Sequence, residues 1–295
     1  MELTDPPKIK AATTYNAAAD HFDDEPLGFW DRYGRRTVAR LSLRRGARIL
    51  DAACGTGASA LPAAETVGPD GKVIAVDLAE KLLSLGRAKA SAQGLDNVKF
   101  KLGDMTALGY PDHHFDAVVC VFGVFFVPDM KGLVAELWRM VKPFGKLAVT
   151  TWGPRFFEPM YSQWNEAVRA ERPDLYAAFN PWDRITEPEA VRRLFEDAGI
   201  PAVEVATESG RQRLAAPEDW WTIVLGSGLR WTVEQLGPEA ASRLRERNLA
   251  WARSESVAAV ETNVIYAVAT KAADSLYERN EAPPGDAANR APSVC

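Results

Sequence analysis

A loop between a strand-like run and a helix-like run carries the residues in this chain that are best suited to chemistry. It spans residues 51–60 and reads Asp-Ala-Ala-Cys-Gly-Thr-Gly-Ala-Ser-Ala. Its glycines let the backbone approach a ligand closely, and the first turn of the following helix offers free N–H groups. Read as G-x-G-x-x-A, with Asp77 a suitable distance further on, the loop also fits a dinucleotide site.

Two acids beside this loop favour S-adenosylmethionine (SAM) over a nicotinamide dinucleotide. Asp51 directly precedes the glycines, where a carboxylate would repel a pyrophosphate but attract the ammonium and sulfonium groups of SAM. Asp104, which follows another apolar run, can accept a hydrogen bond from the adenine amine. We therefore expect SAM as the cofactor, with a NAD(P)-dependent oxidoreductase as the alternative. The loop residues expected to contact SAM are Ala53, Gly55, Thr56 and Gly57.

A third acid, Asp77, ends the apolar run 73–77. At a strand tip it can hold both ribose hydroxyls of a cofactor, and its other role would be to cap the helix that begins about two residues later. We favour the ribose role because Asp51, Asp77 and Asp104 all fall at carboxyl ends of expected strands. Leu78 and Met105 would then flank the adenine, although either could equally belong to the core.

Positioning these residues requires a sheet, and the chain has the alternation of a doubly wound α/β protein. Strands are expected at 47–52, 72–78, 98–103, 115–122, 146–152, 202–207 and 264–270, and helices at 58–67, 80–93, 129–141 and 188–198. Strands that alternate with helices at this spacing form a parallel sheet with helices on both faces. We expect a seven-stranded, mostly parallel sheet with the glycine loop at the carboxyl end of its first strand.

The two ends of the chain differ from this alternating part. Residues 1–43 are helix-like and are expected to form a lid, with the SAM-binding core at 44–152. Residues 153–271 combine the remaining strands with a helical insertion that is expected to shape an acceptor pocket. The tail at 272–295 is rich in proline, glycine and charge and is expected to be disordered.

Composition narrows the class of protein. The formal net charge of −5 gives no overall basic field, so we expect no nucleic-acid partner. The longest apolar run, 117–127, is too short to span a bilayer, and the N-terminus has no signal-peptide pattern, so a cytoplasmic protein is expected. Three widely spaced cysteines give neither a disulfide framework nor a metal site.

The motif around residues 49–57 resembles the first motif of class I SAM-dependent methyltransferases, closest to the group that includes ubiquinone and menaquinone C-methyltransferases. Phe115-Asp116-Ala117-Val118 and the residues after it resemble that family's fourth-strand motif, and 140–146 is similar to its turn into the fifth strand. Phe144 departs from the family's usual glycine in that turn. The resemblance covers residues 45–152 and implies the fold and the cofactor, but not the acceptor.

The acceptor is expected over the carboxyl ends of the strands, near Cys120 and Phe122, which are themselves expected to contact SAM. Aromatic residues are dense after residue 152 and would make a dry pocket for a small apolar or aromatic molecule. The expected walls are Phe126, Trp152, Tyr161 and Trp182, although core packing explains most aromatics equally well. We expect methyl transfer to an O, C or N atom of such a molecule. A SAM-binding partner protein without catalysis is the second alternative.

The N-terminal lid carries one candidate catalytic residue. Tyr15, His21 and Trp30 fall in the segment that folds over SAM in related methyltransferases, and His21 could act as a general base. A surface or helix-packing role is the other interpretation of His21. No cluster of metal ligands is seen, and methyl transfer by this route needs no metal. A small-molecule acceptor is the expected partner, and a homodimer is left open.

Overall fold

The computed structural model describes residues 5–177 and 179–273. The disorder expected for the tail therefore falls almost wholly outside the described residues. The strands are β1 (Arg48–Ala52), β2 (Lys72–Asp77), β3 (Val98–Leu102), β4 (Phe115–Val121), β5 (Val141–Trp152), β6 (Val203–Glu208), β7 (Arg211–Arg213), β8 (Ala259–Glu261) and β9 (Val264–Thr270). The α-helices are α1 (Pro6–Ala18), α2 (Phe29–Leu41), α3 (Ala60–Val67), α4 (Glu80–Ala92), α5 (Met130–Arg139), α6 (Met160–Glu171), α7 (Pro188–Asp197), α8 (Glu218–Leu225), α9 (Arg230–Leu236) and α10 (Pro238–Ser254).

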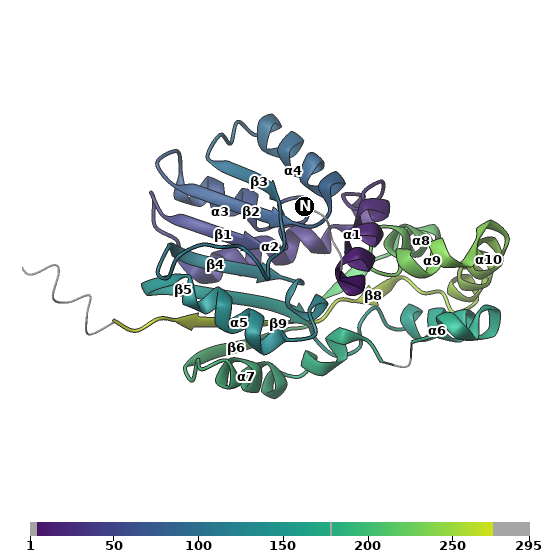
Figure 1. Ribbon diagram of the computed structural model, residues 1–295. Helices are drawn as coiled ribbons and strands as arrows, with labels where there is room; N and C mark the ends of the chain where they lie inside the picture. The colour runs from purple at the N-terminus through teal and green to yellow at the C-terminus, as the bar shows by residue number, and fades with distance from the viewer. Residues whose placement is uncertain (1–4, 178, 274–295) are drawn as a thin grey trace, which may run out of the picture.

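Seven strands form one sheet in the order β3-β2-β1-β4-β5-β9-β6 (Figure 1). The neighbours from β3 to β5 pair in parallel, while β9 runs antiparallel to both β5 and β6. The expectation of a seven-stranded, mostly parallel sheet is confirmed. Strand order reverses between β1 and β4, and ligands of open α/β sheets bind outside the carboxyl ends of strands at such a reversal.

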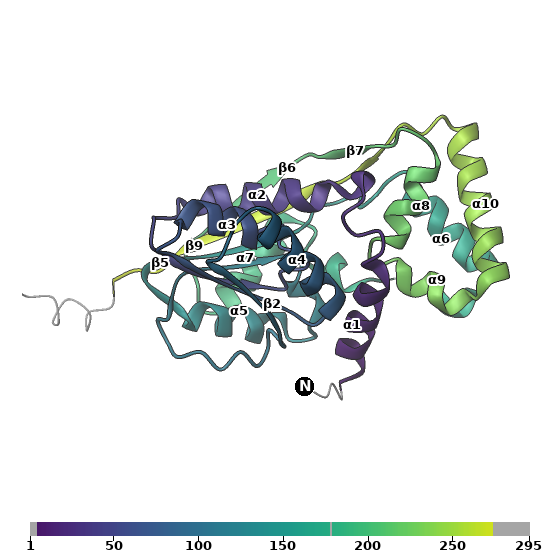
Figure 2. The ribbon, with the colours of Figure 1, turned by 90° about the horizontal axis from the view of Figure 1, so that it is seen from above.

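Helices cover both faces of this sheet. Helices α2 and α3 pack on one face and α5 and α7 on the other, as the view from above shows (Figure 2). Central strand β4 has Ala117, Val118 and Val119 fully buried, which explains its almost continuous apolar sequence. The buried sheet holds the ends of β1, β2 and β4 in fixed positions relative to one another.

Helices α6, α8, α9 and α10 form a lobe to one side of the sheet (Figure 2). Its interior includes Trp220, whose Nε1 donates a 3.0 Å hydrogen bond to the side-chain oxygen of the buried Asn248. A two-stranded ribbon, β7 with β8, connects this lobe to the sheet. The sequence did not predict this ribbon, because three-residue strands are too short to show alternation.

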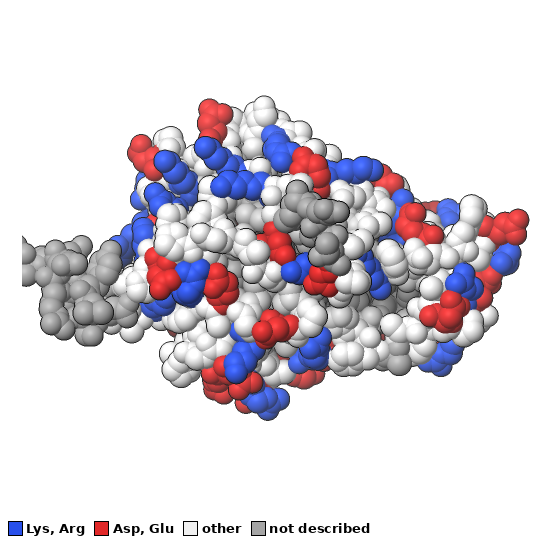
Figure 3. Space-filling model, viewed as in Figure 1, with Lys and Arg blue, Asp and Glu red and all other residues white. Residues whose placement is uncertain are grey.

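The helices before the first strand take different positions. Helix α1 lies between the sheet and the lobe, where it contacts α4 and α9 (Figures 1 and 2). Helix α2 instead packs on the sheet, with Tyr33 and Phe29 fully buried. On the face shown in Figure 3, basic and acidic side chains are interspersed over the surface, in line with the modest net charge.

Candidate functional site

The carboxyl ends of β1 and β4 carry two residues with left-handed backbone. Ala53 follows β1 with a φ of 66°, and Phe122 follows β4 with a φ of 54°. Residues other than glycine adopt this conformation rarely, and such strain concentrates at functional sites. Both lie where the strand order reverses, so local strain and topology indicate the same place.

The glycine loop turns the chain from β1 into α3. Gly55 and Gly57 have φ values of 54° and 95°, and the amide of Gly57 donates to the carbonyl of Cys54 at 2.9 Å. A Cβ on Gly57 would lie 3.0 Å from the Leu61 and Phe100 side chains. Glycine is therefore required at position 57 by both backbone angle and space.

Asp77 joins this loop to the end of β2. One carboxylate oxygen accepts the amide of Gly55 at 2.8 Å, and the other accepts the amide of Ala79 at 2.9 Å. Burial raises the pKa of Asp77, and backbone hydrogen bonds offset part of that rise. Asp77 thus stabilises the turns after β1 and β2. Its contact with the ribose remains a prediction, and the remaining lone pairs of the two carboxylate oxygens would accept the ribose hydroxyls.

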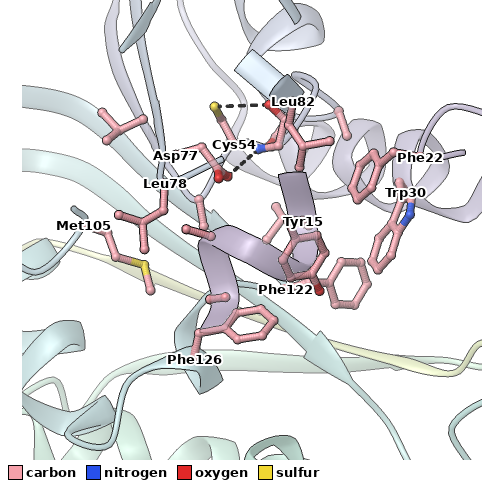
Figure 4. Close-up of a pocket in the computed structure, with 18 of the residues that line it drawn as sticks. Tyr15, Phe22, Trp30, Cys54, Asp77, Leu78, Leu82, Met105, Phe122 and Phe126 are labelled. Atoms are coloured by element: carbon pink, nitrogen blue, oxygen red, sulfur yellow. Dashed lines mark hydrogen bonds between the residues drawn. The ribbon is translucent and has the colours of Figure 1, made fainter. Parts of the chain in front are cut away.

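A cavity of about 110 Å³ opens beside these strand ends (Figure 4). Its lining consists of Ala11, Ala12, Tyr15, Phe22, Trp30, Ala53, Cys54, Gly55, Ala58, Ser59, Val76, Asp77, Leu78, Leu82, Gly103, Met105, Val121, Phe122 and Phe126. Residues of α1 and of the turn after it are part of this lining, so these segments cover one side of the strand ends.

Aromatic rings form the side of the cavity that faces away from the strand ends. The ring of Tyr15 meets Phe126 edge-on at 5.5 Å and Phe22 at 6.1 Å, and Phe22 stacks on Trp30 at 5.4 Å. Figure 4 shows Leu78 and Met105 on the opposite side of the pocket from Phe22 and Trp30. The rings come from α1, the following turn, α2 and the segment after β4, so the cover is assembled from distant parts of the sequence.

Asp51 lies behind the cavity lining in an unusual state. Its side chain is fully buried, Oδ2 accepts the hydroxyl of Ser59 at 2.7 Å, and Oδ1 has no hydrogen-bond partner. Burial raises the pKa of Asp51 to about 7, with Asp77 adding to the rise and Ser59 and the Ala60 amide opposing it. An unpaired buried carboxylate oxygen beside a second acid fits a ligand that brings positive charge.

Part of this chain is similar in sequence to known methyltransferases. The family model of a methyltransferase domain matches residues 49–145. A demethylmenaquinone methyltransferase from Geobacillus kaustophilus is 42% identical over 108 residues, which cover 37% of this chain and 46% of that protein. One from Bacillus cytotoxicus is 30% identical over 182 residues, which cover 58% of this chain and 77% of that protein. The chain belongs to the class I SAM-dependent methyltransferases.

Within that family it falls in the group that includes the demethylmenaquinone methyltransferases, and its cofactor is SAM. The predicted resemblance is thus confirmed. The match to the Geobacillus kaustophilus methyltransferase spans about half of that protein's length. The YcgJ protein from Bacillus subtilis has the same fold, with a TM-score of 0.54 and 17% identity over 82% of this chain and all of that one. Within residues 5–177 and 179–273, none of the helices has the length and apolar character needed to cross a membrane.

Nine residues expected to contact cofactor or acceptor line the methyltransferase pocket. They are Tyr15, Trp30, Ala53, Gly55, Asp77, Leu78, Met105, Phe122 and Phe126. Four other expected residues do not line the pocket: Asp51, Thr56, Gly57 and Cys120. The first two and Cys120 are almost completely buried, and a Cβ at Gly57 would face the side chain of Leu61. The hydroxyl of Thr56 donates to Asp23 at 2.8 Å and so holds the N-terminal turn against the loop.

Asp104 is not among the lining residues, although its neighbours Gly103 and Met105 are. Its carboxylate accepts Lys8 Nζ of α1 at 2.6 Å and the backbone and side chain of Thr106 at 2.8 Å. Burial alone would raise the pKa of Asp104, but these hydrogen bonds outweigh it and lower the pKa. In the structure Asp104 thus ties α1 to the end of β3, and its contact with adenine remains a prediction.

The structure does not place His21 in the pocket. Its Nδ1 lies 2.8 Å from an Asp24 carboxylate oxygen in the exposed turn after α1, and its side chain is about one-third exposed. Phe22, the next residue, lines the cavity instead. The expected general base at position 21 therefore has no geometric support, because the turn directs the neighbouring side chain inward.

Three expected acceptor walls, Trp152, Tyr161 and Trp182, do not line this pocket. Trp152 is buried behind Phe122, on which it stacks at 4.2 Å. The ring of Trp182 packs against Phe125 and Phe156, and the hydroxyl of Tyr161 accepts a 2.8 Å hydrogen bond from Asn180. Burial raises the pKa of Tyr161 to about 12. These residues belong to a connected network of rings in or against the core, and their role as acceptor walls stays a prediction.

Sequence reasoning missed Phe22, Ser59 and Leu82, which all line the cavity. Ser59 lies in the glycine loop and hydrogen-bonds Asp51, so a polar residue inside that loop was the signal that could have identified it. Phe22 and Leu82 had no comparable signal. Which side of a turn or helix faces a cavity depends on tertiary packing.

Proposed function

We propose that this chain transfers the methyl group of SAM to a small, apolar acceptor. The observation that carries the proposal is the charge of the pocket. Of the described residues that line it, Asp77 is the one acid, and no Lys, Arg or His accompanies it, while the buried acid Asp51 lies directly behind. Such a site suits a cationic cofactor and disfavours the two negative charges of a dinucleotide pyrophosphate.

The chain's residues have distinct tasks in this proposal. When bound, SAM supplies a methyl group that its sulfonium already activates for in-line displacement. The glycine loop lets the backbone approach the cofactor, Asp77 holds the ribose and Asp51 balances positive charge. Tyr15, Phe22 and Phe126 cover the reacting groups and exclude water, and alignment in a dry site is the main contribution that such a transfer needs.

The aromatic cover supports an apolar or aromatic acceptor, with its O, C or N atom as the methyl acceptor. Because the relatives from Geobacillus and Bacillus are demethylmenaquinone methyltransferases, quinone-like rings are the first acceptors to test. We also propose that the partner is a small molecule rather than a nucleic acid and that the protein is cytoplasmic. The proposal leaves the question of a homodimer open.

Calorimetric titration with SAM, S-adenosylhomocysteine and NAD tests the cofactor. We expect micromolar binding of both adenosyl ligands and none of NAD, and binding of NAD alone would refute the proposal. Incubation with SAM and a panel of reduced quinones and phenols, followed by product mass, tests transfer. Adenosyl binding with no methylated product across broad acceptor classes would favour a SAM-binding protein without catalysis.

A further inference from the structure

Two aromatic rings of the pocket cover stack on each other, and each is followed in the chain by an acid. Phe22 and Trp30 both line the pocket, with 5.4 Å between their ring centroids and 3° between their planes (Figure 4). The next residues are Asp23 and Asp31. Neither acid belongs to the pocket lining, so neither is expected to contact a ligand there.

A lysine of α4 brings these two acids together. Lys89 Nζ lies 2.9 Å from Asp23 Oδ1 and 3.7 Å from Asp31 Oδ1. The hydroxyl of Thr56, in the glycine loop, donates to the same Asp23 oxygen at 2.8 Å and accepts Lys89 Nζ at 3.2 Å. The turn after α1, helix α2, the glycine loop and α4 thus meet in one polar group of residues. We call Asp23, Asp31, Thr56 and Lys89 the lysine cluster.

The lysine cluster adjoins the point where the stacked rings meet the glycine loop. A Cβ on Gly55 would be 3.6 Å from the Phe22 ring, and Thr56 is the next residue of the loop. Thr56 is buried, whereas Asp23 and Lys89 are partly exposed. Because Thr56 is held inside the loop, its hydrogen bond fixes Asp23 and with it the backbone that presents Phe22 to the pocket.

We propose that the lysine cluster positions the stacked rings of Phe22 and Trp30 over the glycine loop, and that SAM affinity depends on this although the cluster does not touch SAM. A cover that is already held in place need not be ordered when a ligand binds, which raises affinity. The inference rests on the proposed function, because the rings are taken to cover the cofactor. It also assigns Thr56 a positioning role in place of the expected contact with SAM.

Variants of Thr56 separate its hydroxyl from its volume. Thr56→Val keeps the volume but removes the donor to Asp23, whereas Thr56→Ser keeps the donor. We expect Thr56→Val to weaken S-adenosylhomocysteine binding by about three- to tenfold in calorimetry, mainly through faster dissociation in stopped-flow measurements. Thr56→Ser should restore the affinity to within about twofold of wild type. Equal losses in the two variants would contradict a role for the hydroxyl.

Two neighbouring acids give a matched pair of variants. Asp23→Asn replaces the charged acceptor of Thr56 and Lys89 by a neutral one. Asp24→Asn makes the same change one residue later, where the partner is His21 in the exposed turn. We expect about three- to tenfold weaker S-adenosylhomocysteine binding for Asp23→Asn and less than about twofold for Asp24→Asn. Similar losses in both would mean that the turn responds to any loss of charge.

A double-mutant cycle tests whether the cluster acts through Phe22. Phe22→Leu removes the stacked ring but keeps an apolar residue in the cover. If Asp23 acts by positioning that ring, the effect of Asp23→Asn should shrink to less than about twofold in the Phe22→Leu background. The same loss in both backgrounds would overturn the inference, because a purely structural role of Asp23 does not depend on the ring.

Two further readouts keep the outcomes distinct. Urea titration of each variant gives its free energy of unfolding, which separates a loss of stability from a loss of affinity. If wild-type protein does not bind S-adenosylhomocysteine, the proposed cofactor site fails and this inference fails with it. If wild-type protein binds and the cycle is additive, the cofactor site stands and the positioning role alone is refuted.

Discussion

The two sides of the pocket are built in different ways. The strand-end side consists of Ala53, Gly55 and Asp77, whose positions follow from the buried parallel sheet and whose hydrogen bonds are to backbone amides. The cover consists of Tyr15, Phe22 and other rings that touch through faces and edges. The strand ends are held by the buried sheet, whereas the cover is held by contacts between side chains. Polar recognition and shape are therefore divided between a rigid side and an aromatic cover.

The largest effect is expected on the rigid side. Asp77→Ala removes the acceptor for the Gly55 amide and the expected ribose contact, and each hydrogen bond to a charged group is worth about 1.5–3 kcal/mol. Affinity for S-adenosylhomocysteine should fall by about 100-fold or more in calorimetry. Asp116→Ala is the control, because it removes a carboxylate that holds Arg48 and Lys142 at the other end of β4. Similar losses in both variants would show that the effect is on stability alone.

A smaller effect is expected from the ionisation of Asp51. Its pKa of about 7 lies above the ordinary value of 3.8, so the protonated carboxyl stabilises the ligand-free fold at low pH. That contribution is lost as the pH rises from about 4 through 7. The ammonium group of a bound ligand prefers the ionised form, so affinity for S-adenosylhomocysteine should rise over the upper part of this interval and level off above it.

Calorimetry at several pH values measures this linkage. For a group with this pKa we expect about tenfold weaker binding at pH 6 than at pH 8. Asp51→Asn should flatten the profile, because the amide does not titrate. A wild-type profile no steeper than that of the variant would mean that Asp51 is not coupled to the ligand, and the division between rigid side and cover would lose its electrostatic part.

The cover should respond more weakly. Lys8 of α1 reaches Asp104 at 2.6 Å and Thr106 at 2.8 Å, and so fastens the cover to the end of β3. Partly exposed ion pairs contribute about 0.2–1 kcal/mol, so Lys8→Ala should weaken S-adenosylhomocysteine binding only about two- to fivefold. The difference from wild type should shrink at high salt. Lys131→Ala, at an exposed position of α5, serves as the control, and an equal loss there would remove the assigned role of Lys8.

The same division explains how much could be predicted from the sequence. The parallel sheet, the glycine loop, Asp77 and Met105 were predictable because strand runs are visible in the sequence and parallel strands place their carboxyl ends at one edge. The cover was only partly predictable, since Tyr15 and Trp30 line the pocket as expected. In the turn after α1 the inward residue is Phe22 rather than His21, because turn geometry decides which neighbour points inward.

Aromatic residues of the C-terminal part were harder still. The expectation for Trp152 and Trp182 rested on aromatic density, which is the same in a pocket wall and in a core. The structure places both in a network of rings that runs from Phe122 through Phe156. A ring at the surface of such a network and a ring inside it have similar local sequences, so only the packing of the lobe on the sheet distinguishes them.

The smallest effect is expected at Phe144, in an irregular part of β5 away from the pocket. Phe144 has a φ of 63° and is 70% exposed, at a position where the family resemblance leads us to expect glycine. Left-handed backbone costs a residue other than glycine about 1–2 kcal/mol, whereas glycine adds about 0.5–1 kcal/mol of chain entropy to the unfolded state. Phe144→Gly should therefore raise the free energy of unfolding by about 1 kcal/mol or less in urea titration and leave ligand affinity unchanged. A loss of affinity in this variant would mean that this part of β5 is coupled to the strand ends, and that the rigid side extends beyond the residues that line the pocket.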